Sequence, residues 1–135
     1  MQISPDGRWL AYISNESGQN EVYVRSLKGE AARYQVPSAG GAEPMWGVDG
    51  KELFFRNGPF LFSATLATAP GFTVIRRDSL FAMDAAGGVV ESNYGVTPDG
   101  NHFIIPRLKD GTNPPVVVFG WMDEVRESLA GEGKK

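Results

Sequence analysis

The sequence predicts an all-β protein that is built from repeated antiparallel sheets. Two observations support this prediction. One short phrase occurs three times along the 135 residues, as "SPDGRWLAYIS" from Ser4, "GVDGKELFFRN" from Gly47 and "TPDGNHFIIPR" from Thr97. The residues after the Asp-Gly pair of each phrase alternate with a period of two, which is typical of a strand and not of a helix. Each copy therefore indicates a turn that is followed by a strand.

The turn itself follows from the chemistry of the phrase. In x-Pro-Asp-Gly, proline sets the φ angle of the first turn position, and the aspartate side chain accepts hydrogen bonds from nearby backbone N–H groups. Glycine then adopts the left-handed conformation that closes the loop. Val48 replaces proline in the second copy, and a type I turn tolerates this change. The predicted structural turn residues are Pro5, Asp6, Gly7, Asp49, Gly50, Pro98, Asp99 and Gly100.

The spacing of the copies predicts the architecture. Asp6, Asp49 and Asp99 lie 43 and 50 residues apart, and intervals of this size are typical of repeat proteins. A unit of about 40 to 45 residues with four antiparallel strands is one blade of a β-propeller. We therefore expect about three four-stranded antiparallel meanders, the last with three strands, arranged as a partial ring.

The end of the chain has a different pattern. Trp121, Val125 and Leu129 recur at helical spacing with charged residues between them, so a short C-terminal helix is predicted after the last strand. The predicted bounds are 1–36 for blade 1, 37–90 for blade 2, 91–121 for the incomplete blade 3, 122–131 for the helix and 132–135 for a disordered tail.

The repeated phrases also resemble a known repeat family. The stretches "ISPDGRWLAYISNESGQNEVYVRSL", "GGAEPMWGVDGKELFF" and "YGVTPDGNHFIIP" are similar to the TolB-type propeller repeat, a relative of the WD-type repeats. The ending "PPVVVFGWMDEVRESL" resembles the carboxyl end of propellers that follow the kinase domain in some bacterial serine/threonine protein kinases and related sensor proteins. The resemblance implies a module that binds a protein or peptide and has no catalysis of its own.

Composition argues against several classes of function. The net charge of -3 is mild and the Lys and Arg residues are scattered, so we expect no nucleic-acid partner. The absence of cysteine excludes a disulfide framework and a thiolate metal site. No run of about 18 apolar residues occurs, so no membrane insertion is expected. The localisation stays open, and a periplasmic or extracytoplasmic parent protein is one option.

No catalytic, cofactor-binding or metal-binding residue is predicted, and we expect the chain not to be an enzyme. His102 is the only histidine, and one histidine without cysteines cannot supply an ordinary zinc site. The repeated aspartates raise the alternative of a calcium site, but turn chemistry accounts for them and the alternating carboxylates of a calcium loop are absent. The hydrolase phrase G-x-S-x-G does not occur either.

A partial ring would expose one apolar blade face at each end, which exceeds what monomers usually show. Self-association would cover these faces, most simply as a homodimer that closes a six-bladed ring, and an open, aggregation-prone fragment is the alternative. The expected inter-blade packing residues are Trp9, Tyr12, Trp46, Phe54, Phe103 and Trp121.

Two functions are consistent with these observations. The first is a non-catalytic propeller fragment that acts as a protein or peptide interaction module and self-associates. The second is an accessory sensor or gating domain of a larger enzyme, either a serine/threonine kinase or a prolyl-peptidase-like hydrolase, whose catalytic domain lies outside this sequence.

Overall fold

The computed structural model of the chain describes residues 1–29, 32–36, 39–82, 94–105 and 116–118. Every helix or strand assigned in these ranges is a β-strand, so the prediction of an all-β protein is confirmed. In the described ranges, no helix has the length and hydropathy that a membrane span requires. The chain divides into two compact units, Met1–Ala82 and Met83–Lys135.

Several predicted features lie outside the described residues. They are the C-terminal helix at 122–131, the tail at 132–135 and the side chain of Trp121.

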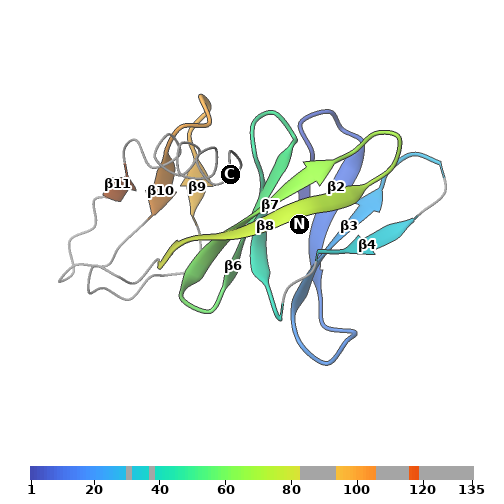
Figure 1. Ribbon diagram of the computed structural model, residues 1–135, viewed down its shortest axis with the longest axis horizontal. Coiled ribbons are helices and arrows are strands. Elements are labelled where there is room, and N and C mark those ends of the chain that lie inside the picture. The colour runs from blue at the N-terminus through green and yellow to red at the C-terminus, as the bar shows by residue number, and fades with distance from the viewer. Residues whose placement is uncertain (30–31, 37–38, 83–93, 106–115, 119–135) are drawn as a thin grey trace, which may run out of the picture. The chain divides into compact units, whose positions relative to one another are not determined.

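The first sheet contains four antiparallel strands in the order β1-β2-β3-β4 (Figure 1). Trp9 and Ala11 on β2 are buried, whereas Leu10 and Tyr12, which alternate with them, are half-buried, so β2 has one covered side and one more open side. The strands span Gln2–Ile3 (β1), Trp9–Ser14 (β2), Glu21–Ser26 (β3) and Arg33–Gln35 (β4).

The second sheet repeats this plan with the order β5-β6-β7-β8. A two-residue loop joins β6 to β7, because Asn57 stands opposite Phe60 and Gly58 between them has a positive φ of 57°. The strands span Ala42–Trp46 (β5), Glu52–Asn57 (β6), Phe60–Ala67 (β7) and Thr73–Ala82 (β8).

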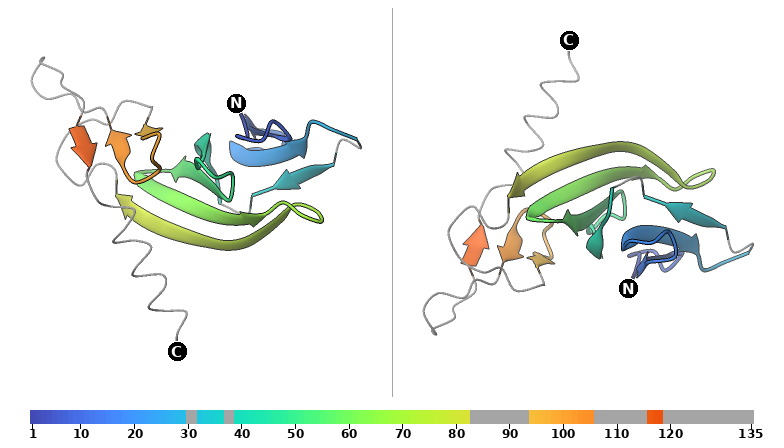
Figure 2. Two further views of the ribbon diagram at one scale, coloured as in Figure 1. Left: turned by 90° about the horizontal axis from the view of Figure 1, so that it is seen from above. Right: turned by 90° about the horizontal axis from the view of Figure 1, so that it is seen from below.

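Strand β8 is ten residues long and curves along β7 (Figure 2). Its register with β7 shifts twice, so that Ile75 and Leu80 stand opposite no residue of β7. Extra residues of this kind are β-bulges, which bend the strand that carries them. The two bulges therefore account for the curvature of β8.

The second unit contains a three-stranded sheet in the order β11-β10-β9. Phe103 and Ile105 on its central strand are buried, and the ring centroid of Tyr94 lies 6.4 Å from that of Phe103. The strands span Gly95–Val96 (β9), Phe103–Ile105 (β10) and Val116–Val118 (β11).

All three sheets share one register, which defines equivalent positions between them. The residue before each repeated phrase pairs with the residue seven positions later. The next strand continues the match, because Leu10 pairs with Arg25 as Leu53 pairs with Ala64. The three equivalent inner pairs are Ile3 with Leu10, Trp46 with Leu53, and Val96 with Phe103.

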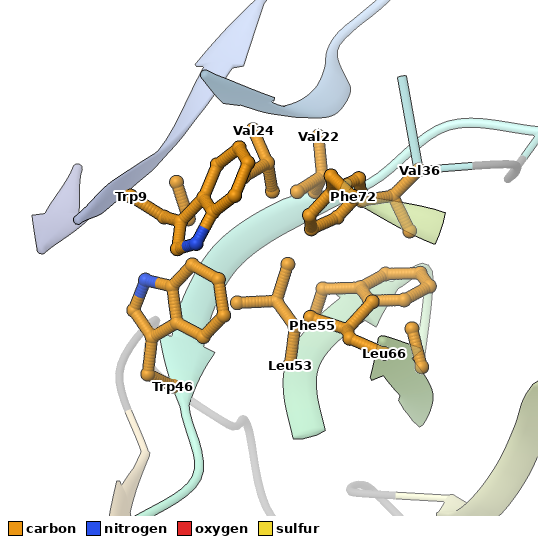
Figure 3. Packing of buried hydrophobic residues seen from close by; sticks show 11 residues of the cluster. Trp9, Val22, Val24, Val36, Trp46, Leu53, Phe55, Leu66 and Phe72 are labelled. Carbon is orange, nitrogen blue, oxygen red and sulfur yellow. The ribbon is translucent and has the colours of Figure 1, made fainter. Parts of the chain in front are cut away.

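The core of the first unit lies between the first and second sheets. One face of each sheet contributes to a single buried cluster, in which the rings of Trp9 and Trp46 lie close to each other (Figure 3). Leu53 and Phe55 are completely buried there, and full burial of such a side chain stabilises a fold by about 1.5–3 kcal/mol. The cluster contains Trp9, Ala11, Val22, Val24, Val36, Trp46, Leu53, Phe55, Ala64, Leu66 and Phe72.

Candidate functional site

The first copy of the repeated phrase forms a tight turn between β1 and β2. The Gly7 N–H donates to the Ser4 carbonyl oxygen over 2.9 Å, and Gly7 has a φ of 70°. Oδ1 of Asp6 accepts the Ser4 hydroxyl at 2.6 Å and the Arg8 N–H at 3.0 Å. The Ser4 hydroxyl oxygen in turn accepts the Trp9 N–H at 3.0 Å. A chain of hydrogen bonds thus links the start of the turn to the first residue of β2.

The third copy repeats these bonds with threonine in place of serine. The Thr97 hydroxyl donates to Oδ1 of Asp99, and that oxygen also accepts the Asn101 N–H at 3.0 Å. The Thr97 hydroxyl oxygen accepts the His102 N–H at 3.2 Å. The Gly100 N–H closes the turn on the Thr97 carbonyl oxygen at 2.8 Å. Pro98 is exposed here, as Pro5 is in the first copy.

The second copy keeps the turn but lacks the hydroxyl. The Gly50 N–H donates to the Gly47 carbonyl oxygen at 3.0 Å, and Oδ1 of Asp49 accepts the Lys51 N–H at 2.9 Å. A Cβ atom on Gly47 would lie 3.3 Å from both Cβ and the carbonyl oxygen of Glu52. A side chain at position 47 would therefore require Glu52 to move by a few tenths of an ångström.

The hydroxyl groups also tune the turn carboxylates. The Ser4 hydroxyl lowers the pKa of Asp6 below its ordinary value, and the Arg8 N–H adds to this effect. The Thr97 hydroxyl and the Asn101 N–H lower the pKa of Asp99 in the same way. Both carboxylates thus act as acceptors that hold a turn.

His102 lies beside the third turn. Its Nδ1 is 3.7 Å from Oδ2 of Asp99, a separation at which a protonated imidazole attracts the carboxylate. Within the part of the chain that the structure describes, no group of three or more His, Asp or Glu side chains could hold a metal ion.

The residues predicted to pack between blades occupy different places. Trp9 and Trp46 meet in the cluster between the first two sheets. Phe54 is buried on the opposite face of β6 from Leu53, and Phe103 is buried in the third sheet. Tyr12 lies on the open face of the first sheet, away from the cluster. Its packing against another blade stays a prediction.

The open face of the first sheet has a distinct chemistry. We call it the outer face and define it by Ile3, Leu10, Tyr12, Tyr23 and Arg25, which are register partners or near neighbours on one side of the sheet. The Tyr12 and Tyr23 rings stack with their centroids 5.8 Å apart. Apolar, aromatic and cationic groups thus lie side by side on this face.

Arg33 on β4 pairs with Arg25 on the same side of the sheet and extends the outer face, where two contacts hold it in place. Its guanidinium lies 5.0 Å from the centroid of the Tyr23 ring, a cation–π distance, and forms an ion pair with Glu16. The Glu16 carboxylate raises the pKa of Arg33. Arg33 therefore forms one side of the Tyr12–Tyr23 stack.

A buried carboxylate lies beside the Tyr23 hydroxyl, on the same side of the sheet as the tyrosine stack. Glu21 is only 5% exposed, and it accepts hydrogen bonds from the Ser17 hydroxyl at 2.9 Å and the Gln19 amide at 3.1 Å. The Tyr23 hydroxyl at 3.3 Å and the Gln35 amide also donate to it. These donors, led by Gln19, lower the pKa of Glu21, whereas burial raises the pKa of the Tyr23 hydroxyl. The carboxylate thus organises the end of the outer face.

A shallow pocket opens on the outer face beside Tyr12 and Arg25. Its volume is about 360 Å³, and its lining is mostly apolar with one guanidinium. That group belongs to Arg25, which is exposed and forms no ion pair with any residue that the structure describes. The pocket is lined by Met1, Leu10, Tyr12, Ile13 and Arg25.

No motif in the sequence marks Glu21, Tyr23, Arg25 or Arg33 as members of a site. Each of them looks like an ordinary strand residue when it is considered alone. The repeat alignment carries a signal for one of them, because Arg25 occupies the position of Ala64 in the second sheet. An arginine at a position that is buried in the neighbouring repeat indicates a face with a different role.

Comparison with known proteins adds no identification. None of the family models matches the chain, and no curated protein matches its sequence.

Proposed function

We propose that the chain is a non-catalytic β-propeller fragment of the TolB type, which acts as a protein or peptide interaction module and self-associates. The outer face of the first sheet is the observation that carries this proposal. Ile3 is 61% exposed on it, although the equivalent Trp46 of the second sheet is 6% exposed. A sheet face that is open in the first repeat and covered at the equivalent position of the second is a candidate surface for binding a partner.

Two further observations support the propeller assignment. The first and second sheets are both four-stranded antiparallel meanders, as blades are, and they pack face to face on one apolar cluster. In all three sheets the same turn joins the first two strands in the same register. Repetition of one packing unit is what generates an arc of blades.

The solution mass tests the proposed self-association. Light scattering on a size-exclusion column, over a series of concentrations, should give twice the chain mass of 14.6 kDa. The dimer fraction should fall on dilution as mass action requires. A folded monomer at every concentration would contradict self-association and leave only a module for a different protein.

A further inference from the structure

We infer that the outer face of the first sheet docks the third sheet of a second copy, through the face that carries Gly95, His102 and Ile104. This inference rests on the proposed self-association and names the two surfaces that meet. Two observations support it: the equivalent positions in the three sheets and the charged groups beside the two surfaces.

The equivalent positions identify the outer face as one half of a known contact. In the second sheet, Trp46, Leu53 and Phe55 form the face that packs on the first sheet. Their equivalents in the first sheet are Ile3, Leu10 and Tyr12, which all lie on the outer face. The outer face of the first sheet is therefore equivalent to the face of the second sheet that the first sheet covers.

The same comparison identifies the other half of the contact. In the first sheet, Gln2, Trp9 and Ala11 lie on the side that meets the second sheet, where Figure 3 shows the Trp9 and Trp46 rings together. Their equivalents in the third sheet are Gly95, His102 and Ile104. All three of these residues are half-buried, so this side of the third sheet keeps accessible surface. The pair that corresponds to Trp9 and Trp46 is then His102 of one copy and Ile3 of the other.

Charge favours a second copy as the occupant. Residues 1–82 contain eight acidic and eight basic side chains, whereas residues 83–135 contain eight acidic and only five basic ones. The second unit thus carries the whole net charge of -3. Arg25 on the outer face has no ion-pair partner among the described residues, and Oδ2 of Asp99 lies 3.7 Å from Nδ1 of His102 beside the other surface, so the two surfaces bring groups of opposite charge.

Cross-linking tests which surfaces meet, and the absence of native cysteine makes the background low. One chain carries Ile3→Cys and a second, with a different tag, carries His102→Cys, and the two are expressed together. A short bis-maleimide should give a covalent dimer that contains both tags. Either variant alone should give little cross-linked product, because the two-fold pair does not bring identical positions together.

Ile75 provides a matched control for Ile3. It is 64% exposed on β8, compared with 61% for Ile3, and it lies outside both docking faces. The variant Ile3→Lys should raise the dimer dissociation constant at least tenfold, and Ile75→Lys should leave it unchanged. Circular dichroism of both variants checks that they are folded.

The outcomes separate the inference from the proposal on which it rests. If the unmodified chain is a monomer, both are wrong. The chain can also be a dimer in which Ile75→Cys and Ile3→Cys cross-link to His102→Cys with equal yield. In that case self-association stands and the assigned surfaces are wrong. Equal weakening of the dimer by the two lysine variants would overturn the assignment in the same way.

Discussion

Trp46 joins the first two sheets by bonding twice to Gln2. Its indole N–H donates to the Gln2 carbonyl oxygen over 3.2 Å, and its backbone N–H donates to Oε1 of Gln2 over 3.3 Å. Trp9 lies in the same apolar cluster, but its buried indole nitrogen has no hydrogen-bond partner among the residues that the structure describes. The two tryptophans of this cluster therefore differ in whether their indole N–H group contributes a hydrogen bond to stability.

This difference predicts unequal costs for the same substitution. Both Trp46→Phe and Trp9→Phe remove part of a buried ring, but only Trp46→Phe also removes a hydrogen bond. A typical bond of this kind contributes about 0.5–1.5 kcal/mol to stability. We expect Trp46→Phe to lower the free energy of unfolding by about 1 kcal/mol more than Trp9→Phe, as measured by urea denaturation.

The variant Gln2→Ala serves as the control for this comparison. It removes the side-chain acceptor and keeps the carbonyl that receives the indole, so it should cost less than Trp46→Phe. Equal losses from Trp9→Phe and Trp46→Phe would show that ring volume alone decides the cost.

The turn hydroxyls lead to a second prediction. Replacing Ser4 with alanine removes the donor to Asp6 and the acceptor for the Trp9 N–H, so Ser4→Ala should destabilise the fold by about 1–2 kcal/mol. The same change should raise the pKa of Asp6 towards its ordinary value, because the Ser4 hydroxyl is the main group that lowers it. An NMR titration of the Asp6 carboxyl carbon measures that shift directly. An unchanged titration curve would contradict the assigned role of the hydroxyl.

The second copy of the turn predicts the opposite response to a hydroxyl. Gly47→Ser would introduce the group that the other copies use, yet its Cβ would lie 3.3 Å from the carbonyl oxygen of Glu52, which accepts the Gly47 N–H at 2.8 Å. That oxygen cannot retreat without weakening the bond. We expect Gly47→Ser to destabilise the fold by about 1–2 kcal/mol, in the range of overpacking. A rise in the thermal midpoint would show that β6 moves away at little cost.

Local chemistry explains why some features could be predicted from the sequence. Each turn is determined by a few consecutive residues, such as Ser4, Asp6 and Gly7, whose hydrogen bonds stay within the phrase. Strand alternation is local in the same sense, so the all-β class could be predicted. The antiparallel order of neighbouring strands follows from the short loops between them.

The outer face could not be predicted because its contacts depend on register. Tyr12, Tyr23 and Arg33 come from three different strands and meet only when those strands align. The sequence does not reveal the role of Glu21, because its hydrogen-bond donors come from the preceding loop and from β4 and meet the carboxylate only in the folded chain. Alternation shows that Trp9 and Tyr12 lie on opposite faces, but it does not show which face another sheet covers.

The buried carboxylate on β3 leads to the last prediction, which concerns acid stability. The pKa of Glu21 is lower in the folded chain than its unfolded value of about 4.3. A carboxylate of this kind stabilises the fold above the unfolded pKa, and its contribution is lost as the pH falls through the folded pKa. Glu21→Gln turns one acceptor into a donor that faces other donors, so it should lower the urea midpoint at pH 7. The free energy of unfolding of Glu21→Gln should also fall less steeply than that of the unmodified chain as the pH drops below the unfolded pKa of glutamate.

Glu16→Gln is the matched control, because Glu16 is an exposed carboxylate whose ion pair with Arg33 lies on the surface. Exposed pairs contribute little to stability, so this variant should change the urea midpoint at pH 7 much less than Glu21→Gln does. The comparison is made by urea denaturation of both variants at several pH values between 2 and 7. If the two variants lose equal stability and keep the same pH profile, the donors around Glu21 do not stabilise its charged form.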